Sequence, residues 1–183
     1  GGKVNIRGTR IKEWHNDVPG DFDASGSKLE YVNPKCKFGG SVNLKEARFL
    51  KEWHNDVPGD FDARESILEY VHPACKFGES VNVTKTNIKE WHNDVPSRFI
   101  AEWSKLEYVN PKCKFSGFVN ISNTNIKEWH CDVGGDFYAC EFGLESVNPN
   151  CVFGGDVDIS YTKITEWHND VGGNFHYVGS NLE

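Results

Sequence analysis

The sequence lacks the features that mark several common classes of protein. No segment has the ~18 consecutive apolar residues that a membrane-spanning helix requires. The 20 lysines and arginines are outnumbered by 27 aspartates and glutamates, so no basic stripe is available for a nucleic-acid backbone. Residues 1–4 do not resemble a signal peptide. We therefore expect neither membrane insertion nor nucleic-acid binding, and the cellular compartment stays open.

Helical periodicity is missing as well. No segment keeps apolar residues at a spacing of about 3.6 over even two turns. The chain instead alternates over very short stretches, as at Val4 and Ile6, and then reaches corners such as Val18-Pro19-Gly20-Asp21. Glycine permits the positive φ that a tight corner needs. This pattern is typical of very short strands with one face in a core.

What the chain does have is internal repetition. One segment opens at intervals of 38, 39, 38 and 38 residues, at Val4, Val42, Val81, Val119 and Val157. A fainter copy of it opens between them, at Phe22, Phe61, Phe99, Phe137 and Phe175. The unit is therefore 18 to 20 residues long, and the chain holds ten such coils in five double repeats. A coil this short cannot bury its apolar face alone, but stacked coils can.

Stacking places equivalent residues of successive coils in columns. One column alternates large and small side chains: Trp14, Val32, Trp53, Val71, Trp91, Val109, Trp129, Val147 and Trp167. Another alternates in charge: Lys12, Glu30, Lys51, Glu69, Lys89, Glu107, Lys127 and Glu145. The first pattern fills a core without voids, and the second disfavours a one-coil slip. An extra residue before Leu50 predicts a bulge in the third coil.

The segments Val119–Ile126 and Val157–Ile164, with the Gly-Gly corners before Val42 and Val157, carry a family resemblance. They resemble leucine-rich repeats of the LxLxxTxIxxLP kind, in particular the short repeats of bacterial and phage proteins with VGGSLDLxGTxI corners. The resemblance implies a curved binding scaffold with no catalysis and no cofactor. Leucine is mostly replaced by Val, Phe, Ile and Trp, and histidine stands where the family has proline, so a parallel β-helix stays an alternative.

We accordingly predict a mainly-β chain in which residues 1–183 form a single, right-handed, leucine-rich-repeat-like solenoid of ten coils. Its first and last residues stop inside coils and do not look like polar caps. We interpret the chain as a piece of a longer array, with self-association through the open ends as another possibility.

The motif Glu-Trp-His-Asn-Asp recurs in the odd-numbered coils and suggests a sugar or metal site. Its copies, however, lie two coils or about 10 Å apart, and such histidines cannot share one zinc ion. We therefore interpret the tryptophan as inward, with His and Asn completing the turn. His54, His72 and His92 occupy three consecutive coils and form a weak candidate for a transition-metal or pH-sensing site.

Four cysteines recur two coils apart, beyond the reach of a disulfide: Cys36, Cys75, Cys113 and Cys151. We interpret them as small buried residues, which suits a reducing compartment. Cys131 lies in the coil between those of Cys113 and Cys151, so one bridge involving it stays open. We place Cys140 on an outward position.

The outward column next to each strand opening is Asn or Asp through the first five coils and is then interrupted by Ile100 and Tyr138. Aromatic residues gather nearby. We predict a partner-binding surface on coils 6 to 9 made of Ile100, Trp103, Phe118, Tyr138, Phe142 and Tyr161. The alternative is local repacking, with Trp103 and Phe142 folded over the edge of the core.

The function that we expect is a non-enzymatic scaffold that binds a protein partner. A carbohydrate-binding or cell-surface structural solenoid is the alternative, in which exposed tryptophans and the Asn/Asp ladder contact a glycan; a fully buried tryptophan column would count against it. An enzyme on a β-helix is not favoured, because the coils stay within 18 to 20 residues and leave no inserted loops for a cleft.

Overall fold

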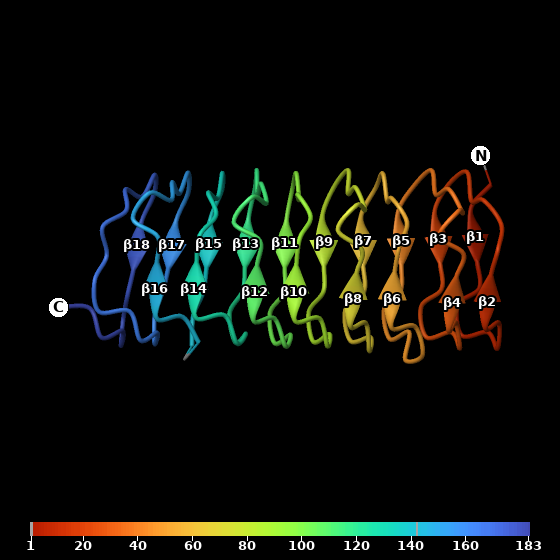
Figure 1. Cartoon of the computed structure of the whole chain (residues 1–183), viewed down its shortest axis with the longest axis horizontal. Coiled ribbons are helices and arrows are strands. Elements are labelled where there is room, and N and C mark those ends of the chain that lie inside the picture. The colour runs from red at the N-terminus through yellow and green to blue at the C-terminus, as the bar shows by residue number, and fades with distance from the viewer. Residues whose placement is uncertain (1, 142) are drawn as a thin grey trace.

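The computed structural model describes residues 2–141 and 143–183, and its strands are two residues long and parallel. One sheet of ten strands runs the length of the molecule from the N-terminal to the C-terminal end (Figure 1). In spatial order it contains β1 (Val4–Asn5), β3 (Phe22–Asp23), β5 (Val42–Asn43), β7 (Phe61–Asp62), β9 (Val81–Asn82), β11 (Phe99–Ile100), β13 (Val119–Asn120), β15 (Phe137–Tyr138), β17 (Val157–Asp158) and β18 (Phe175–His176). Spatial order follows chain order, so the chain is a parallel β-solenoid of about ten turns.

A second side of the solenoid carries four separate two-stranded sheets. They pair β2 (Glu13–Trp14) with β4 (Tyr31–Val32), β6 (Glu52–Trp53) with β8 (Tyr70–Val71), β10 (Glu90–Trp91) with β12 (Tyr108–Val109), and β14 (Glu128–Trp129) with β16 (Ser146–Val147). A third side has isolated bridges such as Val18 to Phe38. Within residues 2–141 and 143–183, no helix has the length and apolar character needed to span a membrane.

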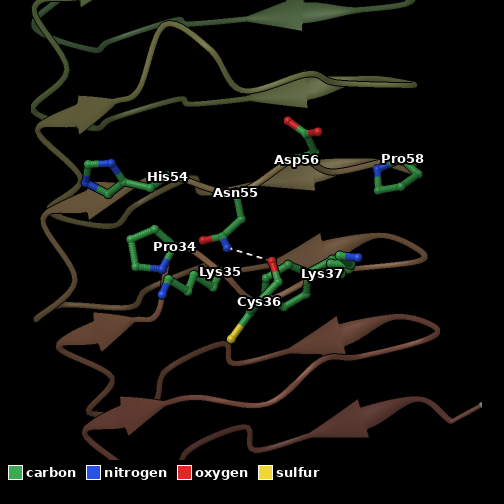
Figure 2. Close-up of a pocket in the computed structure, with 9 residues that line it drawn as sticks. Pro34, Lys35, Cys36, Lys37, His54, Asn55, Asp56 and Pro58 are labelled. Carbon is green, nitrogen blue, oxygen red and sulfur yellow. Dashed lines mark hydrogen bonds between the residues drawn. The ribbon is translucent and has the colours of Figure 1, made fainter.

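The second side is divided into pairs because odd and even coils differ in length. Register partners on the ten-stranded sheet are 18 residues apart from Val4 to Phe22 and 20 apart from Phe22 to Val42. The additional residues of the even coil form a loop around Pro34, just after β4. The amide of Asn55 in the next coil donates to the carbonyl of Cys36 at 2.8 Å (Figure 2). It also donates to the carbonyl of Asn33 at 3.0 Å. A side chain thus supplies hydrogen bonds where the strands do not pair.

The core contains a continuous row of aromatic rings, which we call the aromatic spine. Successive rings have centroids 4.8 to 5.6 Å apart, in the order Trp14, Phe22, Phe38, Trp53, Phe61, Phe77, Trp91, Phe99, Phe115, Trp129, Phe137, Phe153, Trp167 and Phe175. Trp53, Trp91 and Trp129 are 0% exposed. The inward tryptophan column is therefore confirmed, and these three rings cannot contact a glycan.

Members of the charged column pair with one another within double repeats, and Lys163, from outside the column, reaches Glu145 across a double-repeat boundary at 3.7 Å. Lys12 contacts Glu30 at 2.8 Å and Lys51 contacts Glu69 at 3.1 Å, and the next two double repeats have the same pair. No salt bridge joins Glu30 to Lys51 in the described part of the chain. The alternating column therefore does not form one continuous ladder, since the Lys–Glu pairs of successive double repeats are not joined to one another.

The predicted bulge in coil 3 is confirmed. Ala47 and Leu50 are both buried, while Phe49 between them is 47% exposed. In coil 5 the backbone N–H of Asn87 donates to the carbonyl of Leu68 in the coil before, and coils 7 and 9 repeat this bond. Among the described residues no such backbone bond reaches the carbonyl of Leu29 from coil 3. The inserted residue has displaced it.

Candidate functional site

The outward face of the ten-stranded sheet is built on a ladder of asparagine and aspartate side chains. In each, Oδ1 accepts a hydrogen bond of 2.9 to 3.2 Å from the backbone N–H two residues later; they are Asn5, Asp23, Asn43, Asp62, Asn82, Asn120 and Asp158. Such bonds hold the chain at the corner that follows each strand. The ladder is therefore primarily structural, and its interruptions are the informative positions.

Two interruptions, at Ile100 and Tyr138, flank a cluster of side chains on coils 6 to 8. The rings of Phe118 and Tyr138 meet edge to face, with centroids 5.2 Å apart at 84°. The guanidinium carbon of Arg98 lies 5.5 Å from the centroid of Phe118. Strand register places Ile100 beside Asn120 and Asn120 beside Tyr138. We call Arg98, Ile100, Phe118 and Tyr138 the aromatic patch.

The aromatic patch is held together by its own contacts. Ile100, Phe118 and Tyr138 are each half-buried, although they point away from the core. An edge-to-face ring pair and a cation above a ring add to simple burial, each by about 0.5–1 kcal/mol at an exposed site. In coil 8 the missing ladder acceptor is replaced, because the N–H of Cys140 donates to the hydroxyl of Ser122 at 3.1 Å. The local backbone thus accommodates the aromatic residue.

Carboxylates border the patch on its C-terminal side. Partial desolvation, together with Asp136, Asp156 and Asp158, raises the pKa of the Tyr138 hydroxyl, which stays protonated at neutral pH. None of these three carboxylates has a salt-bridge partner among the described residues, whereas Asp21 near the N-terminal end pairs with Lys3 at 2.6 Å. The patch therefore has an unpaired acidic border.

Two further predicted residues lie at a corner of the coils. Trp103 and Tyr161 adopt left-handed backbone conformations, with φ of 58° and 61°, at the position that Gly8 and Gly26 occupy in the first two coils. Their side chains are 55% and 54% exposed. Trp103 is not folded over the core, so local repacking does not account for it. The same corner has positive φ in other coils, for example at Glu46, Glu65 and Lys85, so the conformation belongs to the coil and the exposed aromatic ring is what distinguishes these two positions.

The six predicted surface residues thus fall into three groups. Phe118 and Tyr138 are in contact, and Ile100 lies on the same sheet face. Trp103 and Tyr161 share a corner column but lie three coils apart. Phe142 falls outside the described residues. Sequence reasoning missed Arg98, although its register opposite Phe118 was available from the repeat alone.

Each histidine of the recurring motif contacts the glutamate two residues before it. His54 Nε2 lies 3.0 Å from Glu52, the other four copies repeat this contact, and His54 is 5.5 Å from the ring of His72. His72 Nδ1 accepts the N–H of Ala74. Within residues 2–141 and 143–183, no group of three or more His, Cys, Asp or Glu is arranged to hold a metal. The predicted site at His54, His72 and His92 is therefore not arranged as a metal centre in the described structure.

All six cysteines are free thiols, so no bridge involves Cys131. Cys36, Cys75, Cys113 and Cys151 are buried as predicted. Cys140 was placed wrongly: it is half-buried, with Sγ 3.6 Å from the carbonyl of Asp158. Burial raises the pKa of Cys131 to about 12, with smaller contributions from Cys113 and Cys151. Such thiols are poor nucleophiles at neutral pH.

Comparisons with known proteins found no match: no family model, no curated protein and no solved structure matches the chain.

Proposed function

We propose that this chain is a non-enzymatic scaffold that binds a protein partner through the aromatic patch. The proposal rests on one observation, the interruption of a regular polar ladder by apolar and aromatic side chains on a single face. Tyrosine and arginine are enriched among the residues that dominate binding energy, and both are present in this cluster. Coils of near-constant length, without inserted loops, support a binding role over a catalytic one.

The acidic border favours a partner that carries positive charge. Asp136, Asp156 and Asp158 accept backbone N–H groups but form no salt bridge among the described residues, and the formal net charge of the chain is −7. Complementary charges at the rim of an interface accelerate association and exclude like-charged competitors. We therefore expect a protein partner that places an apolar side chain on Phe118 or Tyr138 and cationic side chains on the carboxylates. The same charge disfavours nucleic acid.

For the coil geometry we propose a right-handed winding, because connections between parallel strands of one sheet are almost always right-handed. The leucine-rich-repeat resemblance remains a proposal at the level of the corner motifs. Three hydrogen-bonded sides per turn, at strands, strand pairs and isolated bridges, favour the parallel β-helix alternative.

The test uses a variant that restores the ladder with residues the chain already uses in the same columns. It combines Ile100→Asn and Tyr138→Asn, after Asn82 and Asn120, with Phe118→Ser, after Ser80. Wild type and variant are compared by affinity capture with quantitative mass spectrometry, and by circular dichroism for the fold. We expect the variant to fold and to lose a basic protein that wild type captures.

Light scattering on both proteins completes the experiment. A wild type that self-associates beside a monomeric variant would make the patch a contact between copies of this chain. Equal capture of the same partners by both proteins would refute a binding role for the patch.

A further inference from the structure

A hollow lies between coils 2 and 3, on the side of the solenoid that carries the two-stranded sheets. It has a volume of about 320 Å³. Its polar lining comes from Glu30, Lys51, Glu52 and His54, and its apolar lining comes from Tyr31, Val32, Pro34, Phe49 and Leu50. Tyr31 and Phe49 are 43% and 47% exposed. Concave sites with aromatic walls and a few polar groups are typical of small-ligand binding.

The hollow owes its shape to the bulge of coil 3. The inserted residue directs Phe49 outward and removes the backbone bond that would otherwise connect coil 3 to Leu29. The neighbouring charges do not bridge the gap either. Glu30 of coil 2 pairs with Lys12 of coil 1, and Lys51 of coil 3 pairs with Glu69 of coil 4. Coils 2 and 3 are therefore joined less closely here than later coils are.

A second hollow adjoins the first. It has a volume of about 480 Å³ and lies around the Pro34 loop, with Lys37 and Asp56 in its wall (Figure 2). Pro34 and His54 line both hollows. The second hollow recurs in later double repeats, beside His92 and beside His130, because each even coil has the same loop. Only in coil 3 does the sequence insert an aromatic residue next to it.

We propose that the two adjoining hollows bind a neutral saccharide of more than one sugar unit. Sugar rings combine an apolar C–H face with a rim of hydroxyls. Tyr31 and Phe49 expose aromatic surface to the hollow, and no ring–ring contact joins the two among the described residues. The ring of Tyr31 also contacts His15, with centroids 5.6 Å apart, which fixes its position. Glu30 uses Oε1 to pair with Lys12 and Glu52 uses Oε2 to contact His54, which leaves the second oxygen of each carboxylate to accept from a hydroxyl. Lys51 pairs with Glu69 and keeps further N–H donors for a hydroxyl.

Charge and position distinguish this ligand from other classes. The first hollow disfavours a phosphate-bearing ligand, because Glu30 and Glu52 line it and its lysine, Lys51, already pairs with Glu69. The second hollow has Lys35 and Lys37 beside Asp56, so the test includes charged glycans. The site is also independent of the proposed protein-binding function, which uses coils 6 to 8 on another side. It does not use the tryptophan column, whose central members are buried.

The repeat supplies matched variants for the test. Tyr31→Ser copies the column's own Ser146, and deletion of Phe49 restores the length of coils 1 and 5. The control Tyr108→Ser makes the same change beside a gap that has no inserted aromatic residue. The labelled chain is applied to an array of neutral, sulfated and phosphorylated oligosaccharides, and the strongest ligand is measured by titration calorimetry. We expect Tyr31→Ser and the deletion each to weaken binding by about tenfold or more, and Tyr108→Ser to bind like wild type.

Absence of binding to any neutral oligosaccharide would overturn the proposal, as would equal weakening by Tyr31→Ser and Tyr108→Ser. Preference for sulfated or phosphorylated glycans would overturn the neutral ligand class. The ladder-restoring variant of the aromatic patch must keep saccharide binding. Its result therefore separates a failure of this site from a failure of the protein-binding proposal.

Discussion

Cys131 replaces an asparagine that three other copies of the motif use to hold the preceding loop, at Asn55, Asn93 and Asn169. Asn93 Nδ2, for example, donates to the carbonyls of His72 and Cys75 at 3.1 and 2.8 Å. Cys131 offers only a weak S–H contact to the carbonyl of Asn110 at 3.4 Å. We predict that Cys131→Asn raises the free energy of unfolding by about 1 kcal/mol. The gain stays below that of two bonds, because Oδ1 of Asn93 has no partner. Urea unfolding measures it.

The reverse change serves as the control for this prediction. Asn93→Cys removes both amide bonds in a buried position and should cost about 1–3 kcal/mol. A Cys131→Asn chain that is no more stable than wild type would show that the loop of coil 6 does not use the missing donor. The pair of variants thus measures one hydrogen-bonded contact at two places where the surroundings are nearly identical.

At the scale of the element, successive coils come close together at the corner that follows each isolated β-bridge, such as that of Val57 with Phe77. Gly78 donates its N–H to the carbonyl of Val57, and a methyl group on Gly78 would overlap the carbonyl of Pro58. We predict that Gly78→Ala destabilises the fold by about 1–3 kcal/mol, because the two coils must separate. Gly20→Ala is the control: its nearest backbone atom would be 3.3 Å away, and its effect should be within about 0.5 kcal/mol. Thermal unfolding compares them, and equal melting temperatures would contradict close stacking.

The repeat period explains why so much of the fold could be predicted from the sequence. Once the period is known, the residues that stack are known, so the inward tryptophans and the coil-3 bulge followed directly. The aromatic spine did not follow, because Trp53 and Phe61 belong to different columns and their contact depends on the width of the coil. The separation of ion pairs was missed for a similar reason: the Pro34 loop changes the spacing on one side only.

The candidate sites were predicted less completely. The column pattern indicated Ile100 and Tyr138, because a broken ladder is visible in the sequence. It did not indicate that Arg98 covers Phe118, although their register contained that signal. The hollow beside Phe49 was missed entirely, since a sequence shows that an additional residue is present but not that its side chain leaves a gap.

For the whole molecule, stability is the sum of contacts between neighbouring coils, and the buried thiols contribute to many of them. Burial raises the pKa of Cys75, Cys113 and Cys131 from 9.0 to about 12, and that of Cys151 to about 11. These thiols are fully protonated in the folded chain at pH 9 to 10, whereas the unfolded chain releases their protons. Because the unfolded state then binds fewer protons, stability must fall as pH rises above 9.

We therefore predict a progressive loss of stability between about pH 9 and pH 12, of about 1 kcal/mol per buried thiol per pH unit. Lysine and tyrosine side chains titrate in the same range, so the comparison is with the double variant Cys75→Ala/Cys113→Ala. Its stability relative to wild type should improve as the pH is raised from about 8 to about 10 in urea unfolding experiments. A constant difference between the two proteins over this range would show that the thiols ionise equally in both states, and that water reaches the interior between the coils.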